Sequence, residues 1–585
     1  MKTPIIYSVF FLFTLSSFSQ PVVEYWDKEE TKKKSETNYR KGIAHGKYTL
    51  WHKNGKTAKT GLYEDGLEHG TWKSFYEDGK PKAEENYRLG KKDGRFIFWY
   101  ANGKKAQEAF YKSDAPDSTW TGWYENGNLK SVENFQAKSS SYMWASTKHG
   151  NFTYYYENGK KESEGHFVLN DPEGLYTEWY EKGNKKMEGN FSKGAKTGKW
   201  TFWYENGKKK EETEFRDKKY FILNYWDENG KQWVTNGAGT YRVFYPNGAR
   251  KGEGPVKDGS QDGEWLLFDQ DGRKEHLITY SEGKKKGKCI NYFMDGTVKS
   301  EGAFNDELKT GYWKWYYKSG KTEMEGTLDN EIRTGKWKYY YPNGNKESEG
   351  WYKNDNQDSL WVFWYENGQL WKKGMHKNNR RHGLWEFWHS TGKPAQKGNY
   401  NMNQEDGLWE AWYENGQTKD KGYFKVGIMD GKWEGYYPNG IKKYEGAYKD
   451  SLKNGYWKYW FDNGKIWKEG KYINGVQDGY WVSWLKSGTK ENEGAFVNGE
   501  KTGKWTYYFL FGAKRKEENY KFGKLHGKAI EYYDNGKVLS KTGYLLVRQD
   551  KDKPWVSVKQ CTWTYYDKEG KVIREEKYKK GAKVN

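Results

Sequence analysis

The sequence predicts an all-β protein: an elongated antiparallel β-sheet solenoid of about 22 stacked hairpin repeats, each 24 residues long. The first observation is a turn dipeptide at a fixed interval, since Asn439-Gly440 and Asn463-Gly464 lie 24 residues apart. From Gly248 to Gly536 that interval occurs twelve times in succession. The second observation is the alternation of aromatic residues on both sides of each dipeptide, which is typical of hairpins. A period of this length indicates stacked repeats with about 44 short strands rather than several globular domains.

The turn at Asn463-Gly464 sets the predicted strand pairing. Asn-Gly between aromatic runs favours a two-residue turn in which both residues have positive φ. Counting outward from this turn places Trp457 opposite Gly470 and Gly455 opposite Tyr472. Because a ring that lies across a glycine covers bare backbone, we expect Trp457 to cover Gly470.

One face of each strand is predicted to carry the packing rings, because side chains alternate between the two faces of a strand. In one repeat this packing face holds Gly198, Trp200, Phe202 and Tyr204. Nine successive repeats carry tryptophan at its key position: Trp313, Trp337, Trp361, Trp385, Trp409, Trp433, Trp457, Trp481 and Trp505. Glycine and β-prone aromatic residues at these positions argue against the rival reading of a helix.

The repeated pattern G-x-W-x-x-W-Y-E-N-G-x-x-x-x-E-G-x-Y resembles the MORN repeat in its bacterial variant form. The matching residues are Gly198, Trp200, Trp203, Tyr204, Glu205, Asn206 and Gly207, with Glu445, Gly446 and Tyr448 from another repeat. The match extends over nearly the whole mature chain and is specific through its repetition. The resemblance implies stacked hairpins in an elongated sheet, with roles in binding or scaffolding. Bacterial proteins of this family are often labelled antitoxins of toxin–antitoxin systems.

The N-terminal residues 1–19 have the pattern of a secretory signal peptide. Lys2 precedes an apolar run from Ile5 to Leu15, and Ser17-Phe18-Ser19 follows before Gln20. We therefore expect export to the periplasm, the cell surface or the medium. No later segment is long and apolar enough for a transmembrane helix.

The rest of the chain is predicted to divide at breaks in the period. The expected parts are a degenerate first repeat or cap at 20–44, repeats at 45–137, repeats at 138–236 after an eight-residue insertion, a long regular array at 237–536 and an irregular C-terminal repeat or cap at 537–585. Caps of this kind shield the strand edges that a repeat array leaves open.

The chain carries a net charge of +21, but lysine alternates with glutamate along the strands. One interpretation is a solvated face without further function. The other is affinity for an anionic surface such as lipid headgroups, acidic glycans or acidic proteins. Because export is expected, nucleic acid is not an expected partner.

Catalytic and metal-binding patterns are not found in the sequence. Cys289 stands at the tryptophan position of its repeat and Cys561 at the glycine position of its own. The row His382, Asp406 and Asp430 follows the repeat, at about 10 Å per hairpin, which is too far apart for shared metal ligation. We therefore expect no enzyme, no metal and no cofactor. A wall hydrolase module that the patterns do not reveal is the distant alternative.

The candidate binding residues form an aromatic row on the face opposite the packing rings. The row consists of Trp203, Trp364, Trp388, Trp412, Tyr436, Trp460 and Trp484. The predicted pairing adds Trp371 opposite Trp364 and Trp467 opposite Trp460, and we expect Lys372, Lys373 and Lys468 to complete a recognition stripe. The alternative is that these rings only cover lysine stems and stabilise the hairpins. In favour of binding, large rings on a charged face are more apolar than solvation requires.

The function predicted from the sequence is that of a non-enzymatic, exported scaffold or adaptor. Its extended aromatic and basic surface would bind a protein, a glycan or a lipid surface. The alternative is a cytoplasmic, antitoxin-like protein that neutralises a toxin by direct binding, which applies if the N-terminal segment is not a signal.

Overall fold

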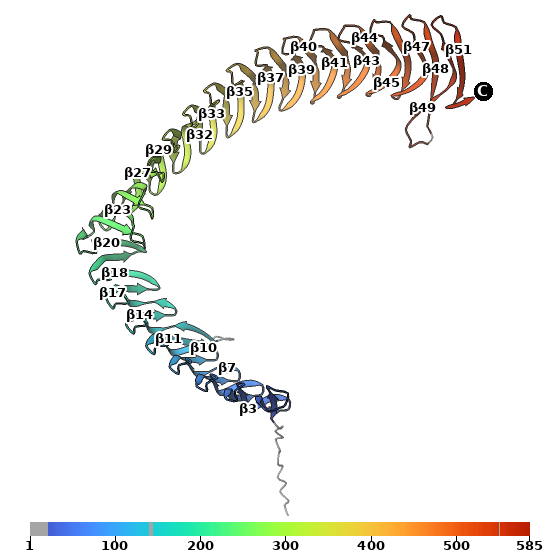
Figure 1. Cartoon of the computed structure of the whole chain (residues 1–585). Helices are drawn as coiled ribbons and strands as arrows, with labels where there is room; N and C mark the ends of the chain where they lie inside the picture. Colours follow the sequence, from blue (N-terminus) through green and yellow to red (C-terminus); the bar gives the residue numbers. More distant parts are fainter. Residues whose placement is uncertain (1–20, 140–143, 549, 585) are drawn as a thin grey trace, which may run out of the picture. The chain divides into compact units, whose positions relative to one another are not determined.

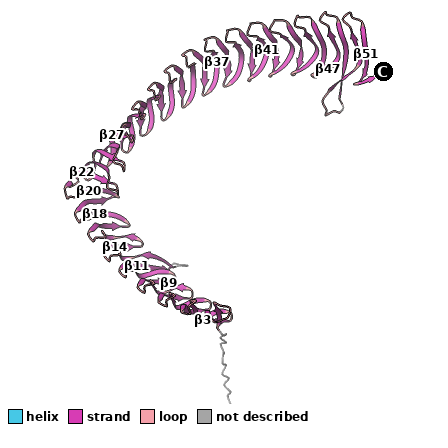
Figure 2. Cartoon of the chain, in the orientation of Figure 1, coloured by secondary structure: helices cyan, strands magenta, loops and turns pink. Residues whose placement is uncertain are grey.

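The computed structural model describes residues 21–139, 144–548 and 550–584. Throughout these residues the regular structure is β-strand, with no helix (Figure 2). Strands that follow one another in the chain pair antiparallel as hairpins. The predicted all-β hairpin solenoid is therefore confirmed. The predicted signal peptide lies outside the described residues.

The strands fall into two compact units. The first contains the described residues up to Gly272, together with Ile278–Lys284. Its strands are β1 (Val22–Tyr25), β2 (Lys33–Arg40), β3 (Ile43–Trp51), β4 (Thr57–Glu64), β5 (Leu67–Phe75), β6 (Pro81–Arg88), β7 (Lys91–Lys92), β8 (Gly94–Trp99), β9 (Lys105–Lys112), β10 (Ala115–Trp123), β11 (Leu129–Ser139), β12 (Trp144–Lys148), β13 (Gly150–Tyr155), β14 (Lys161–Val168), β15 (Asp171–Pro172), β16 (Gly174–Trp179), β17 (Lys185–Ser192), β18 (Ala195–Trp203), β19 (Lys209–Arg216), β20 (Lys219–Trp226), β21 (Gln232–Thr235), β22 (Ala238–Phe244), β23 (Arg250–Lys257), β24 (Ser260–Gln261) and β25 (Gly263–Phe268).

The second unit contains Arg273–Leu277 and the described residues from Lys285 onward. The division passes through β26 (Lys274–Ser281). The strands that follow it are β27 (Lys284–Tyr292), β28 (Val298–Asn305), β29 (Leu308–Tyr316), β30 (Thr322–Asp329), β31 (Ile332–Tyr340), β32 (Lys346–Lys353), β33 (Asn356–Trp364), β34 (Leu370–Lys377), β35 (Arg380–Trp388), β36 (Pro394–Asn401), β37 (Gln404–Trp412), β38 (Thr418–Lys425), β39 (Ile428–Tyr436), β40 (Lys442–Lys449), β41 (Leu452–Trp460), β42 (Ile466–Ile473), β43 (Val476–Trp484), β44 (Lys490–Val497), β45 (Glu500–Tyr508), β46 (Lys514–Lys521), β47 (Lys524–Tyr532), β48 (Val538–Val547), β49 (Val556–Lys559), β50 (Cys561–Tyr566), β51 (Val572–Lys579) and β52 (Ala582–Val584).

Within this second unit the hairpins from β29 to β47 follow one another in chain order as an open stack (Figure 1). The described residues hold 52 strands instead of the expected 44. One reason is that irregular repeats divide a strand in two. In the first unit, for example, β7 and β8 are short pieces that both pair with β6.

The first unit has its own irregular core where the repeat period is lost. Ile222, Tyr225, Val234, Tyr241 and Trp265 belong to one buried cluster there. The Tyr241 hydroxyl donates a hydrogen bond of 2.6 Å to the Glu211 carboxylate. Burial raises the pKa of Glu211, against the opposing effect of this bond. The tyrosine thus satisfies a carboxylate that would otherwise be costly to bury.

The hairpin tips differ from the predicted two-residue turn. At Asn463-Gly464, the Gly464 N–H donates to the Phe461 carbonyl at 3.0 Å, and the Phe461 N–H donates to the Lys465 carbonyl at 2.8 Å. Of the dipeptide only Gly464 has positive φ, at 84°. The tip is therefore a three-residue loop, a type I turn followed by a glycine bulge.

The turn with two residues at positive φ lies at the opposite edge of the sheet. Asn474 and Gly475, with φ of 48° and 85°, join β42 to β43. The two kinds of turn alternate along the stack, so every strand continues directly into its neighbour. The two-residue turn that was predicted at Asn463-Gly464 therefore occurs at Asn474-Gly475, on the other edge of the sheet.

The core register is confirmed, but the register close to the tips is not. Trp457 pairs with Gly470 and Gly455 pairs with Tyr472, as predicted. The additional tip residue then shifts the pairing between Tyr459 and Trp460. Trp460 consequently pairs with Ile466 and not with Trp467. Trp364 likewise pairs with Leu370 instead of Trp371.

The ring that covers each packing-face glycine comes from the following hairpin. A methyl group placed on Gly470 would overlap the indole of Trp481, not that of its register partner Trp457. The Trp481 Nε1–H also donates to the carbonyl of Lys471 at 3.0 Å. The prediction that Trp457 covers Gly470 is therefore wrong, and the tryptophan joins two neighbouring hairpins. The nine predicted core tryptophans are all buried.

The core tryptophans alternate with a second series of rings in edge-to-face contact. From Trp337 to Tyr520 the ring centroids lie 4.9 to 6.4 Å apart, in the order Trp337, Tyr352, Trp361, His376, Trp385, Tyr400, Trp409, Phe424, Trp433, Tyr448, Trp457, Tyr472, Trp481, Phe496, Trp505 and Tyr520. Edge-to-face pairs stabilise beyond the burial of their area. A single-layer sheet thus obtains a continuous core from its own rings.

In two exceptions to the tryptophan–glycine pair both partners are replaced together, whereas Trp120 keeps its indole against Ala109. Where Ala529 replaces the tryptophan, Glu518 replaces the glycine on the paired strand. Where Ile222 replaces the tryptophan, Thr213 replaces the glycine. Since a smaller side chain leaves room for a larger one opposite, the two double replacements indicate that the indole is what requires a small residue beneath it.

We predict that Gly470→Ala destabilises the contact between β42 and β43. The added methyl group would displace the Trp481 ring, and we expect a local loss of about 1–3 kcal/mol, as overpacking gives. Hydrogen exchange of amides in these two strands of the full chain measures it. The double variant Gly470→Ala with Trp481→Ile should recover protection relative to Trp481→Ile alone. Unchanged protection in Gly470→Ala would contradict the role of the indole.

His376 occupies a ring position of the core where other repeats hold tyrosine or phenylalanine. Its side chain is buried between Trp361 and Trp385. Its Nδ1 atom has no hydrogen-bond partner among the described residues. Burial, with Arg381 and Lys372 nearby, lowers the pKa of His376 to about 4. Burial thus keeps the imidazole neutral at pH 7.

We predict that His376 makes local stability fall as the pH falls from about 6.5 to about 4. The unfolded segment takes up a proton near pH 6.5, whereas the folded one does so only near 4, so acid favours unfolding. The expected loss reaches about 3 kcal/mol at pH 4. Hydrogen exchange of β34 at pH 7 and pH 5 measures it. His376→Tyr should remove this component, while the control His382→Asn should retain it.

Candidate binding surface

The outer aromatic row, defined as Trp203, Trp364, Trp388, Trp412, Tyr436, Trp460 and Trp484, lies at the strand ends that lead into the tips. All seven side chains are half-buried. A tyrosine of the preceding repeat fixes the backbone of most of them. The Tyr365 hydroxyl, for example, donates to the Trp388 carbonyl at 2.9 Å, and the Tyr437 hydroxyl does so to the Trp460 carbonyl at 2.9 Å. The rings are therefore held by the repeat and not by flexible loops.

Lysine ammonium groups lie over the rings of this row. The Lys373 Nζ atom is 5.3 Å from the centroid of the Trp388 ring, and the Lys397 Nζ atom is 5.5 Å from that of Trp412. Such cation–π contacts are worth about 0.5–1 kcal/mol at exposed sites. The aliphatic stems of these lysines also cover part of the indoles.

The same lysines are paired with glutamates, so the surface beside the row is largely neutralised. Lys373 lies 3.0 Å from Glu386, and Lys397 lies 3.1 Å from Glu410. Burial alone would raise the pKa of Glu410, but hydrogen bonds and charges from Lys397 and Lys421 hold it below its ordinary value. The basic character predicted for this stripe is therefore weaker than the count of lysines indicates.

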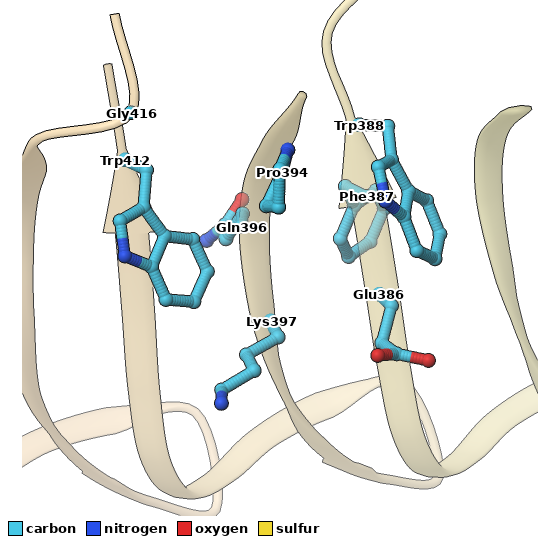
Figure 3. A pocket seen from close by; sticks show the side chains of 8 residues that line it. All are labelled: Glu386, Phe387, Trp388, Pro394, Gln396, Lys397, Trp412 and Gly416. Carbon is cyan, nitrogen blue, oxygen red and sulfur yellow. The ribbon is translucent and has the colours of Figure 1, made fainter. Parts of the chain in front are cut away.

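A pocket of about 410 Å³ opens between two rings of the outer row. Trp388 and Trp412 flank Pro394, which lies on the strand between them (Figure 3). Lys397 and Glu386 line the side farther from the tips (Figure 3). Two indoles on either side of a proline, with one charge of each sign, offer apolar contact and hydrogen bonding together.

Four predicted members of the stripe lie on the opposite face, which is a correction. Trp467 contacts the packing-face rings of Tyr459 and Phe461, at centroid distances of 6.2 and 5.9 Å. Trp371 contacts Phe363 and Tyr365 in the same way. The tip bulge is the cause, because it leaves each of these tryptophans unpaired and turns it to the packing side.

Lys372 and Lys468 belong to that face as well. Each pairs across the hairpin with a packing-face ring, Phe363 and Tyr459 respectively. Burial lowers the pKa of both lysines. Trp371 and Trp467 remain 39% and 41% exposed, so they form a separate aromatic edge. Lys373 alone of the three predicted lysines accompanies the outer row. Whether the predicted residues bind a partner stays a prediction.

The outer face carries a second apolar group that the sequence reasoning missed. Its exposed members in β32 to β38 are Trp351, Leu360, Met375, Leu384 and Tyr423. Leu360 pairs directly with Met375. The signal was present, because the residue before each core tryptophan and the residue after each packing-face glycine must point away from the core. These residues widen the apolar surface from the outer row toward the other edge of the sheet.

The described residues provide neither a cluster of metal ligands nor a membrane-spanning helix. In residues 21–139, 144–548 and 550–584, no group of three or more His, Cys, Asp and Glu side chains is arranged to hold a metal ion. A helix long and apolar enough to cross a bilayer is likewise not found there. Both cysteines are free thiols, Cys289 buried and Cys561 exposed.

Fold and surface together define a hairpin-repeat protein with a ring-packed core. Fourteen segments match the sequence profile described as MORN repeat variant, and together they cover more than half of the chain. They are residues 68–88, 92–113, 116–137, 148–168, 172–193, 196–217, 309–330, 333–354, 357–378, 381–402, 405–425, 429–450, 453–474 and 525–545. The chain belongs to the MORN repeat variant family.

Solved structures of toxin complexes are among those similar to this chain. A crystal structure of TcdB2-TccC3 is 10% identical, with 96% of this chain and 36% of that chain covered and a TM-score of 0.12. A crystal structure of TcdB2-TccC3-Cdc42 is 9% identical, with 96% and 35% covered and a TM-score of 0.11. The Photorhabdus luminescens Tc holotoxin pore gives the same four values. This chain thus spans about one third of the length of those chains. No curated protein sequence matches it.

Proposed function

We propose that this MORN repeat protein is a non-enzymatic, exported scaffold that binds an extended partner along the outer aromatic row. The observation that carries the proposal is the position of half-buried rings in five successive repeats, from Trp364 to Trp460, each anchored in a strand. Rings fixed in this way lose little conformational entropy when a partner docks. The features that the fold brings together are rings and charge pairs, which suit binding rather than catalysis.

The partner most compatible with this surface is a polypeptide or a glycan with apolar and polar faces. Rings recur at about 10 Å per hairpin, since each hairpin contributes two strands about 4.8 Å apart. An extended polymer spans several such intervals, whereas a small molecule reaches one. Lipid headgroups are less favoured, because Lys373 and Lys397 are already paired with glutamates. Nucleic acid is not an expected partner.

Export is proposed from the sequence of residues 1–19. Cell fractionation separates this proposal from the alternative of a cytoplasmic, antitoxin-like protein, which applies if residues 1–19 are not a signal. Recovery of the native chain in the periplasm, cell surface or medium supports the scaffold proposal. Recovery in the cytoplasm favours neutralisation of a toxin by direct binding.

We predict that changing Trp364, Trp388, Trp412 and Trp460 together to serine abolishes partner capture while the fold persists. These side chains contribute little to the core, so the far-ultraviolet circular dichroism should remain that of the wild type. Immobilised full-length protein is incubated separately with solubilised envelope proteins, purified peptidoglycan sacculi and anionic vesicles. The retained species should fall at least about tenfold, as expected when several aromatic side chains are removed from one interface.

The matched control is Trp371→Ser with Trp467→Ser, which removes exposed rings from the opposite face. Capture should remain within about twofold of the wild type in this variant. A twofold change in affinity corresponds to a change of only about 0.4 kcal/mol in the binding free energy. The fraction that yields the retained species identifies the partner class. Equal capture by the fourfold variant and the wild type would assign the outer row a structural role only.

A further inference from the structure

The packing face contains a second series of rings that stack between successive core tryptophans. The second-ring position is defined here as the residue two places after each core tryptophan. Trp315 stacks on Trp313 at 5.7 Å and on Trp337 at 5.6 Å, with interplanar angles of 30° and 28°. Tyr339 and Phe363 stack in the same way between their neighbouring tryptophans. Each ring thus fills the gap between two hairpins.

Ala411 occupies the second-ring position of its repeat, so this filling ring is missing. A hollow of about 440 Å³ lies there. Its walls include Phe387, Trp409, Phe424 and Trp433, the rings that surround the vacant second-ring position. Ala411 itself is only partly buried. The hollow therefore has the walls of a stacking site without a ring at its second-ring position.

Among the nine tryptophan repeats from Trp313 to Trp505, Gly435 and Ser483 also stand at a second-ring position without a ring, as Ser74 and Gly122 do in the first unit. At Gly435 the ring of Tyr444, from the paired strand, lies over the glycine and stacks on Trp457 at 5.9 Å. At Ser483 the hydroxyl donates to the Glu491 carboxylate at 3.3 Å. The arrangement at Gly435 shows that a ring from another strand can fill a vacant second-ring position.

A polar group at the rim gives the hollow chemical selectivity. Asp420, the register partner of Ala411, lines it, as do Gln396 and Lys419. The Asp420 carboxylate accepts a hydrogen bond of 2.7 Å from the Tyr444 hydroxyl. A carboxylate has four lone-pair sites, so capacity remains for a second donor. A ring that carries a donor, such as a phenol or an indole, satisfies both the walls and the rim.

We propose that the hollow over Ala411 is a binding site for a planar aromatic ring that bears a hydrogen-bond donor. The ring stacks between Trp409 and Trp433, as Trp315 does between Trp313 and Trp337, and its donor faces Asp420. The rings that would stack on it belong to the packing face, and Trp388 and Trp412 of the outer aromatic row also line the hollow. The ring reaches it either as a free small molecule or as a tyrosine or tryptophan side chain of a partner polypeptide.

The test titrates the full chain with p-cresol and with 3-methylindole, observed by saturation-transfer NMR, with cyclohexylmethanol as the non-aromatic control. We expect saturable binding of both rings and none of the control. Ala411→Phe supplies the missing ring and should weaken binding at least tenfold. Ser483→Phe, which adds a ring at the equivalent position elsewhere, should leave binding unchanged. Unaltered binding by Ala411→Phe, or no saturable binding of either ring by the wild type, overturns the proposal.

A second variant protects the test against misfolding of Ala411→Phe. Asp420→Asn keeps an acceptor for Tyr444 but removes the charge, and it should weaken p-cresol more than toluene, which lacks a donor. If Asp420→Asn weakens the binding of p-cresol and of toluene equally, the carboxylate has no role in recognising the donor. A third ligand is an extended peptide with blocked ends that contains one tyrosine. If it binds at least tenfold more tightly than p-cresol, the natural source of the ring is a partner polypeptide. If the peptide and p-cresol bind with equal affinity, the natural ligand is a free small molecule. All of these variants keep the residues of the outer aromatic row. The capture assay for that row therefore tests the proposed function separately from this site.

Discussion

The contact on which this structure depends is that of an indole with the glycine of the preceding hairpin. An antiparallel sheet of one layer has no second layer to bury its apolar face, so its rings have to cover one another and the backbone. Trp481 reaches across the hairpin boundary, lies on Gly470 and donates to the carbonyl of Lys471. One side chain thus provides burial, satisfies its own polar atom and joins two repeats. The same contact recurs along both units, for example at Trp200 and Gly189.

A second set of contacts joins the hairpins at their tips. The side chain of Asn463 donates to the carbonyl of Lys486 in the next tip, and Lys486 forms an ion pair with Asp462 at 2.6 Å. The tips carry no ring core, so these polar bonds hold neighbouring loops at a fixed spacing. Stability of such an array is a sum over repeats and their nearest neighbours. Interactions at core and tip both lie between neighbours, which explains why each repeat tolerates an irregular one beside it, as at Ala529.

Much of the fold could be predicted because the sequence repeats its own signals. The period predicted the hairpins, and the placement of Trp457 against Gly470 predicted the core register. The errors began at the tips, where the choice between a two-residue and a three-residue loop depends on backbone angles that Asn-Gly alone does not determine. One additional residue there reversed the face of Trp371 and Trp467. The covering of each glycine by the following repeat was also missed, since a pairing count describes one hairpin at a time.

The candidate sites follow from what each face lacks. On the outer face, charge pairs neutralise the lysines and leave the rings as the distinctive feature, so recognition there rests on ring spacing more than on the net charge of +21. On the packing face of the array from Trp313 to Trp505, rings are the rule, and the distinctive feature is the ring-walled hollow at Ala411. Neighbouring hairpins keep Trp409 and Trp433 in place whether or not a ring lies between them. A repeat protein can therefore gain a preformed site by the loss of a single side chain, because the other rings that form the walls, Trp409 in the same strand and Trp433 in the next hairpin, remain.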